Sequence, residues 1–120
     1  MPSADVAADV RHFTDVLGGR LVFAIEAFGT RVAMVRLTEG PPAVLLAGHL
    51  EGERPILVFR VADIERAVVA VEERGLEPGE RFGIPHGPGC ILDAPGGQRL
   101  AIYELTRPAV AERLAGRRDF

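Results

Sequence analysis

The order of helical and strand-like segments predicts an α+β fold built from two β-α-β-β-β modules, the first of which lacks its opening strand. Helical periodicity occurs twice, each time between an aspartate suited to cap the helix and a glycine suited to end it. Each helix precedes three strand-like runs that glycine and proline separate. An internal repeat of roughly 50 residues normally indicates two copies of one structural unit.

The first repeat starts with a helix in "ADVAADVRHFTDVLGG", where apolar side chains recur at the spacing of one buried stripe. Asp5 is the expected N-cap, and Gly18 the expected end of the helix. Only Met1, Pro2 and Ser3 precede it, too few for a full strand. Three strands are expected to follow, at residues 20–28, 30–37 and 43–50.

The second repeat contains every element of the module. A strand over residues 55–61 leads into a helix over residues 63–75, which Asp63 caps and Gly75 ends. Three further strands are expected, at residues 79–85, 89–93 and 98–105.

These elements predict one domain followed by a short extension. The domain covers residues 1–105, with module one at residues 1–50 and module two at residues 54–105, and residues 106–120 form a C-terminal helix and tail. A chain of 120 residues can bury such a core without disulfides.

Composition excludes several classes of function. A net charge of −3 argues against nucleic-acid binding, because nucleic-acid binders usually carry a basic face. Cys90 is the single cysteine, so neither a disulfide framework nor a cysteine-based zinc site is expected, and it should be a small buried apolar residue. No signal peptide and no apolar run near 18 residues is present, which predicts a cytoplasmic protein without membrane contact.

Three stretches resemble the vicinal oxygen chelate superfamily, the glyoxalase/bleomycin resistance/dioxygenase group: "DVAADVRHFTDVLGG", "LVFRVADIERAVVAVEERG" and "IPHGPGCILDAPGGQRLAIYEL". The resemblance implies that the curved sheets of the two modules enclose a cavity, with helices on the outer faces. The group includes lyases, isomerases, ring-cleaving dioxygenases and metal-free proteins that sequester antibiotics. Fold alone therefore does not choose a reaction.

The resemblance also locates where a metal ion would be held. Metal-using members take His, Glu or Gln ligands from the first and last strands of each module. The corresponding positions here are Leu45 (to within one residue), Ile56 and Ala101, and the fourth falls in the missing strand. Because apolar side chains cannot bind a divalent ion, no metal and no other cofactor is expected.

Glu104 is the one carboxylate of the last strand, in "GQRLAIYEL". Strand side chains alternate between faces, so Glu104 shares the face of Leu100 and Ile102, which should pack toward a helix. We therefore interpret Glu104 as a solvated or paired carboxylate at a strand end rather than as a metal ligand.

The same alternation selects candidate ligand-binding residues on the cavity face: Ile56, Val58, Arg60, Arg99 and Tyr103. Arg60 would suit an anionic ligand, with an ion pair at the cavity rim as the alternative. Tyr103 could stack on a ligand or bond to it, or serve as a core tyrosine.

Two histidines complete the candidate set. His49 follows a strand end in "LLAGHL", and His86 lies in the glycine- and proline-rich loop "IPHGPG", the kind of segment that often carries function. No catalytic residue can be assigned, because the spacing supports no Ser-His-Asp or Cys-His arrangement.

The sequence thus favours a metal-free protein that binds a small molecule in the cavity between its modules. The alternative is a metal-dependent lyase, isomerase or dioxygenase of the same superfamily, with ligands such as His49, His86 and Glu104. An enzyme that uses only acid–base residues is a third reading. A homodimer is also expected, in which the partner covers the incomplete first module. The alternatives there are a start further upstream, or a gap that the chain's own termini cover.

Overall fold

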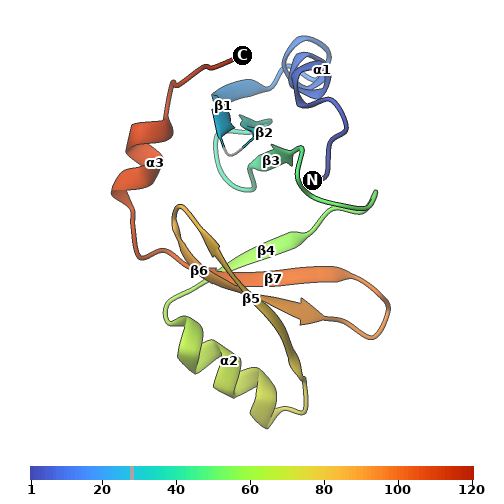
Figure 1. Ribbon diagram of the computed structural model, residues 1–120, viewed down its shortest axis with the longest axis vertical. Coiled ribbons are helices and arrows are strands. Elements are labelled where there is room, and N and C mark those ends of the chain that lie inside the picture. Colours follow the sequence, from blue (N-terminus) through green and yellow to red (C-terminus); the bar gives the residue numbers. More distant parts are fainter. Residues whose placement is uncertain (28) are drawn as a thin grey trace. The chain divides into compact units, whose positions relative to one another are not determined.

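The computed structural model describes residues 1–27 and 29–120, in which the chain forms two compact units (Figure 1). The first unit comprises Met1–Arg54 and Arg113–Phe120, and the second comprises Pro55–Glu112. Each unit has its own sheet and its own hydrophobic core. The fold is therefore α+β with two small sheets, as the sequence predicts.

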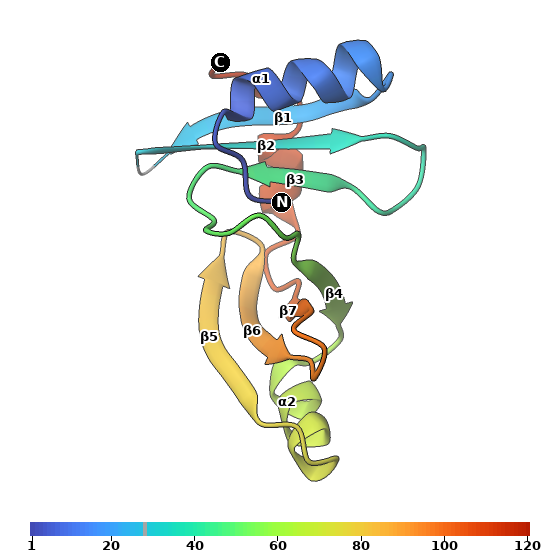
Figure 2. The same ribbon diagram turned by 90° about the vertical axis from the view of Figure 1, so that its right-hand side faces the viewer.

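The first unit places one helical segment against a three-stranded sheet. Its antiparallel strands follow the order β1-β2-β3, and Figure 2 shows α1 lying along one face of them. The predicted end of the first strand, residue 28, lies outside the described residues. The third strand is shorter than predicted. The bounds are α1 (Val6–Arg11), the π-helical η1 (His12–Val16), β1 (Arg20–Ala27), β2 (Thr30–Arg36) and β3 (Val44–Ala47).

The predicted signals set the ends of this helical segment. The Asp5 carboxylate accepts a hydrogen bond from the N–H of Ala8 at 3.0 Å, which satisfies one free donor of the first turn. Gly18 has a φ of +69°, a left-handed conformation that glycine adopts without strain. The apolar stripe between them packs on the sheet, where the core residues are Val6, Ala24, Ala33, Val35 and Leu46.

Within the described residues no full strand precedes α1, but the first residues of the sequence do pair with the sheet. Pro2 forms a single parallel bridge with Ala47 of β3. The Ala47 N–H donates to the carbonyl of Met1 at 3.0 Å, and the Ser3 N–H donates to the carbonyl of Ala47 at 3.2 Å. This one bridge has the same parallel sense as the pairing between the first and last strands of the second unit.

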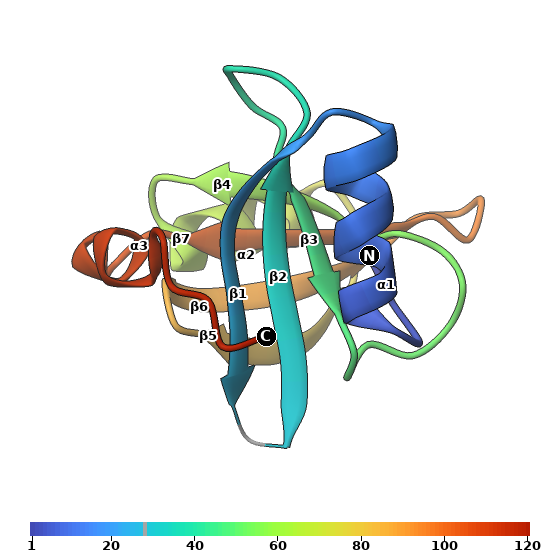
Figure 3. The ribbon, with the colours of Figure 1, turned by 90° about the horizontal axis from the view of Figure 1, so that it is seen from above.

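The opposite edge of this sheet pairs with the C-terminal segment (Figure 3). Ala24 of β1 donates its N–H to the carbonyl of Arg117 at 2.9 Å and accepts from the N–H of Asp119 at 2.7 Å. Gly116 donates to the carbonyl of Val22 at 2.8 Å. Both outer strands of the first sheet are therefore bonded to terminal segments of the chain.

The second unit is a complete β-α-β-β-β module with a short helix after it. Its strands follow the order β4-β7-β6-β5, in which β4 and β7 are parallel and the other neighbours are antiparallel. Asp63 caps the helix by accepting from the N–H of Arg66 at 3.0 Å. The bounds are β4 (Leu57–Val61), α2 (Ile64–Glu73), β5 (Pro78–Ile84), β6 (Gly87–Asp93), β7 (Arg99–Glu104) and α3 (Ala109–Leu114).

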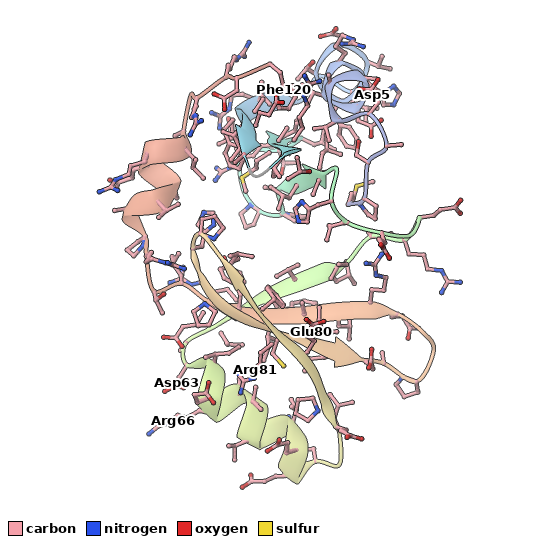
Figure 4. The ribbon with its side chains drawn as sticks, in the orientation of Figure 1. Asp5, Asp63, Arg66, Glu80, Arg81 and Phe120 are labelled. Carbon is pink, nitrogen blue, oxygen red and sulfur yellow. The ribbon has the colours of Figure 1, made fainter. Side chains whose placement is uncertain are left out.

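Helix α2 covers one face of the second sheet. Leu100 and Ile102 of β7 pack with Ile64 and Val68 of the helix, in a core that also contains the buried Cys90. In Figure 4, Arg81 of β5 extends toward α2, where its guanidinium forms an ion pair with Glu65 at 3.0 Å. The alternation predicted for the last strand is confirmed on this face.

No helix in the described part of the chain is long and apolar enough to cross a membrane.

Candidate functional site

The face of the second sheet that points away from α2 carries most of the predicted ligand-binding residues, and is called here the helix-free face. The strand register places Val58 beside Ala101 and Arg60 beside Tyr103, so these side chains project together from neighbouring strands. Ile56 has the same parity as Val58 but lies one residue before β4 begins. The structure thus brings three of the predicted residues, Val58, Arg60 and Tyr103, into one small area.

Arg60 and Tyr103 are the polar centre of this face. Arg60 is exposed and Tyr103 is half-buried. Among the residues that the structure describes, no carboxylate forms an ion pair with Arg60. The guanidinium is therefore available to an external anion, next to an aromatic ring that can stack on it or on a ligand.

Arg99 is placed differently from Arg60. It is the direct cross-strand partner of Asp93 on β6. Opposite charges in that position attract each other and stabilise the pair of strands. Arg99 therefore fits a structural role at the edge of the face better than it fits recognition of a ligand.

Sequence reasoning missed an aromatic residue on the same face. Phe82 of β5 is the direct partner of Gly89 on β6, and Gly89 is in turn the partner of Tyr103. A Cβ added at Gly89 would collide with the Phe82 ring, so the ring lies directly over the glycine. A glycine inside a strand often marks such a close approach, and that was the available signal.

His86 lies in the turn between β5 and β6. Its carbonyl accepts hydrogen bonds from the N–H groups of Thr106 and Arg107, both at 3.0 Å, which join this turn to the segment after β7. Burial, together with the positive charge of Arg107, lowers the pKa of the His86 imidazole below its usual value of 6.5. The ring is therefore neutral at neutral pH and able to both donate and accept a hydrogen bond.

His49 lies in the turn that follows β3, in the first unit, and is exposed. His86 therefore belongs to the same unit as Arg60 and Tyr103, and His49 belongs to the other unit.

The positions where the resemblance would place metal ligands hold no donor atoms. Leu45, Ile56 and Ala101 are apolar, and Ala101 is only 1% exposed. In the described ranges, 1–27 and 29–120, no three His, Cys, Asp or Glu side chains come together closely enough to hold a metal ion. These residues do not fit a divalent ion, which needs three or four oxygen, nitrogen or sulfur donors.

Glu104 is engaged elsewhere. Its Oε2 accepts a hydrogen bond from the N–H of Ile64, the first residue of α2, at 2.9 Å. The prediction that Glu104 faces the helix side of the sheet is confirmed.

Two surface hollows lie away from the helix-free face. One, of about 290 Å³, is on the outer side of α2, lined by Glu65, Arg66, Val69, Ala70 and Glu73. The other, of about 490 Å³, is in the first unit, lined by Gly18, Arg20, Arg36, Leu37, Thr38 and Glu39. The cavity that the resemblance implies between the modules stays a prediction.

Comparison with known proteins supports the fold. No protein-family model and no curated protein matches the sequence. Among solved structures, methylmalonyl-CoA epimerase from Mycobacterium tuberculosis is 17% identical with a TM-score of 0.74, over 92% of this chain and 87% of that one. The hypothetical protein BH1468 from Bacillus halodurans C-125 is 16% identical with a TM-score of 0.71, over 88% of this chain and 90% of that one. The resemblance predicted from the sequence is thus confirmed at the level of the fold.

Proposed function

We propose that this protein binds a small molecule on the helix-free face of the second sheet, without a metal ion. The observation that carries the proposal is the juxtaposition of Arg60 and Tyr103 on neighbouring strands. Small-molecule sites are usually concave pockets lined mainly by apolar side chains, with a few polar groups that fix the orientation of the ligand, and the side chains of this face have that composition.

The chemistry of the face indicates an anionic ligand with an apolar or aromatic body. Arg60 supplies a permanent positive charge, because a guanidinium does not lose its proton in proteins. Phe82, Tyr103 and Val58 supply apolar surface around it. A carboxylate or phosphate on the ligand would pair with Arg60 while its body packs against these side chains.

The metal-dependent alternative has less support. It requires His49, His86 and Glu104 to act together, but the Glu104 carboxylate is bonded to the start of α2. The fold is shared with an epimerase and with a protein of unstated activity, so the fold does not assign a reaction.

A thermal-shift screen of metabolites and antibiotics tests the proposal. A ligand present at about 100 times its dissociation constant adds about 2.7 kcal/mol to the free energy of unfolding. The variants Arg60→Ala and Tyr103→Ala, alone and together, should reduce that shift by more than they lower the melting temperature of the free protein. Arg74→Ala, which removes an exposed arginine from the end of α2, is the matched control and should respond like the unmodified protein.

Elemental analysis of protein purified without chelator tests the second half of the proposal. Well under one metal ion per chain is expected. A stoichiometric metal ion held by protein side chains would overturn the metal-free assignment. If a ligand shifts the melting temperature of the Arg60→Ala/Tyr103→Ala double variant as much as that of the unmodified protein, the proposed ligand site is wrong.

A further inference from the structure

Two arginines of the first unit lie side by side at one end of its sheet. Arg20 is the first residue of β1 and Arg36 the last of β2, and the strand register makes them direct cross-strand partners. Such partners project from the same face of a sheet with Cβ atoms about 5 Å apart. Both side chains are exposed, and both line the hollow of about 490 Å³.

These two arginines lack the carboxylate partner that several others have. Over the residues that the structure describes, neither forms an ion pair. Of the described residues that line the hollow, Glu39 alone is acidic, so two positive charges are placed near one negative charge. Like charges placed directly opposite each other destabilise a strand pair, and a bound anion would relieve that repulsion. The arginines that do form ion pairs are Arg31 with Glu26, Arg81 with Glu65 and Arg117 with Asp119.

We propose that Arg20 and Arg36 form a binding site for a phosphoryl group. The planar guanidinium presents paired N–H donors that match the oxygen atoms of a phosphate, and two adjacent guanidinium groups match its double negative charge. The site lies in the first unit and uses neither Arg60 nor Tyr103. It can therefore hold or fail independently of the function proposed above.

The surroundings of the pair favour a phosphate carried on an apolar molecule. Leu37 lines the same hollow and is 43% exposed. Met34 lies two residues from Arg36 on the same face of β2, beside Leu45 of β3, which is 39% exposed. An apolar group attached to the phosphate would cover these side chains and remove them from water.

An NMR titration of the whole chain tests this site. Inorganic phosphate and phenyl phosphate are added separately at constant ionic strength, and the backbone amide shifts of Arg20, Arg36 and Leu37 are followed. Arg20→Gln and Arg36→Gln should each weaken binding about tenfold, the usual effect of losing a hydrogen bond to a charged group. Glu39→Gln should strengthen binding, because it removes the negative charge from the hollow. Arg74→Gln is the matched control for net charge and should change nothing.

The possible results of this titration distinguish free phosphate from a phosphorylated organic molecule, and also show what would contradict the proposal. Equal affinities for the two compounds identify free phosphate as the ligand, and tighter binding of phenyl phosphate identifies a phosphorylated organic molecule. Shifts spread over arginines throughout the chain, or an Arg20→Gln/Arg36→Gln double variant that binds as the unmodified protein does, would mean an adventitious ion only and would overturn the proposal. Without phosphate the double variant should melt at the same temperature or higher, since it loses a repulsion, and that measurement shows that it folds.

Discussion

The Oε2 atom of Glu104 accepts a hydrogen bond from the backbone N–H of Ile64 at 2.9 Å, so the last strand of the second sheet holds the first residue of α2. The N–H groups of the first helical turn have no partner within the helix, and the helix dipole favours a negative charge beside them. The contact joins residues that are 40 positions apart in the sequence. A carboxylate in the strand that could have carried a metal ligand thus stabilises the fold.

Replacing Glu104 should therefore destabilise the second unit. Glu104→Ala removes the acceptor and the charge, and should lower the free energy of unfolding by about 1–2 kcal/mol in urea titrations. Glu104→Gln keeps an acceptor oxygen and should cost less. Glu77→Ala, at an exposed position after α2, is the control and should change stability little. Equal effects of Glu104→Ala and Glu77→Ala would contradict a role for the contact with Ile64.

The packing of Phe82 over Gly89 predicts a large effect from a single methyl group. Gly89→Ala should destabilise the protein by about 1–3 kcal/mol, because its Cβ would overlap the Phe82 ring. In a Phe82→Ala background the same change should be nearly neutral, since the obstructing ring is gone. Gly83→Ala is the matched control within the neighbouring strand, where an added Cβ meets nothing within 4 Å. Thermal melts of the four variants measure the coupling, and additive effects would argue against the contact.

Asp119 should make the attachment of the C-terminal segment depend on pH. Its carboxylate accepts from the Arg117 guanidinium at 2.8 Å and from the N–H of Glu26 at 2.9 Å. Both contacts lower the pKa of Asp119 below its usual 3.8, and the contact with Arg117 has the larger effect. Because the unfolded chain takes up the proton at higher pH than the folded chain does, this stabilisation is present at neutral pH. It is lost as pH falls below about 4.

Asp119→Asn should therefore melt at a lower temperature than the unmodified protein at neutral pH, and the difference should shrink in acid. Amide hydrogen exchange should be faster at Glu26 in the variant, because the amide of Glu26 loses a charged acceptor. Arg118→Gln removes an exposed charge from the same segment and serves as the control. A difference in melting temperature that does not change between pH 7 and pH 3 would count against the carboxylate as the cause.

A homodimer stays a prediction, and the structure changes the surface expected to form it. The outer strands of the first sheet are bonded to terminal segments, which weakens the argument that a partner must cover that sheet. Strand β4, at the end of the second sheet, carries three consecutive apolar residues that are each more than half exposed: Leu57 at 54%, Val58 at 51% and Phe59 at 56%. Exposed apolar strands of this kind pair readily with other chains.

Light scattering at micromolar concentration should give twice the chain mass of 12.9 kDa. Phe59→Lys should reduce the dimer fraction, because it places a charge on the exposed strand. Val69→Lys adds the same charge on the outer side of α2, at a residue that is 50% exposed, and should leave the mass unchanged. A cooperatively folded protein with the mass of a single chain would show that no dimer forms.

Features set by neighbouring residues could be predicted from the sequence. The caps at Asp5 and Asp63 follow from side chains that accept a hydrogen bond from the N–H group three residues ahead, and the helix ends at Gly18 and Gly75 follow from left-handed backbone. The two faces of β7 follow from strict alternation along a strand. The position of Arg60 next to Tyr103 required the family resemblance as well, because it depends on which strands are neighbours.

Features set by distant residues could not be predicted. The approach of Arg20 to Arg36 depends on the register of β1 and β2, and the approach of Phe82 to Gly89 depends on that of β5 and β6. The C-terminal segment has the composition of a solvated tail, with Arg117 and Arg118 in succession, yet its backbone bonds to β1. Backbone pairing uses N–H and C=O groups that every residue except proline has, so composition carries no sign of it.

The pairing of β1 with residues 116–119 also sets an order of assembly during synthesis. The second unit is one continuous stretch, Pro55–Glu112, whereas the first needs Arg113–Phe120 as well. The acceptor of the Glu26 N–H group is the Asp119 carboxylate, which is translated 93 residues later. Since domains tend to fold as their residues emerge from the ribosome, the second unit can form its core while β1 still has an open edge. On the growing chain, the outer edge of β1 therefore stays without its backbone partners until residues 116–119 have been synthesised.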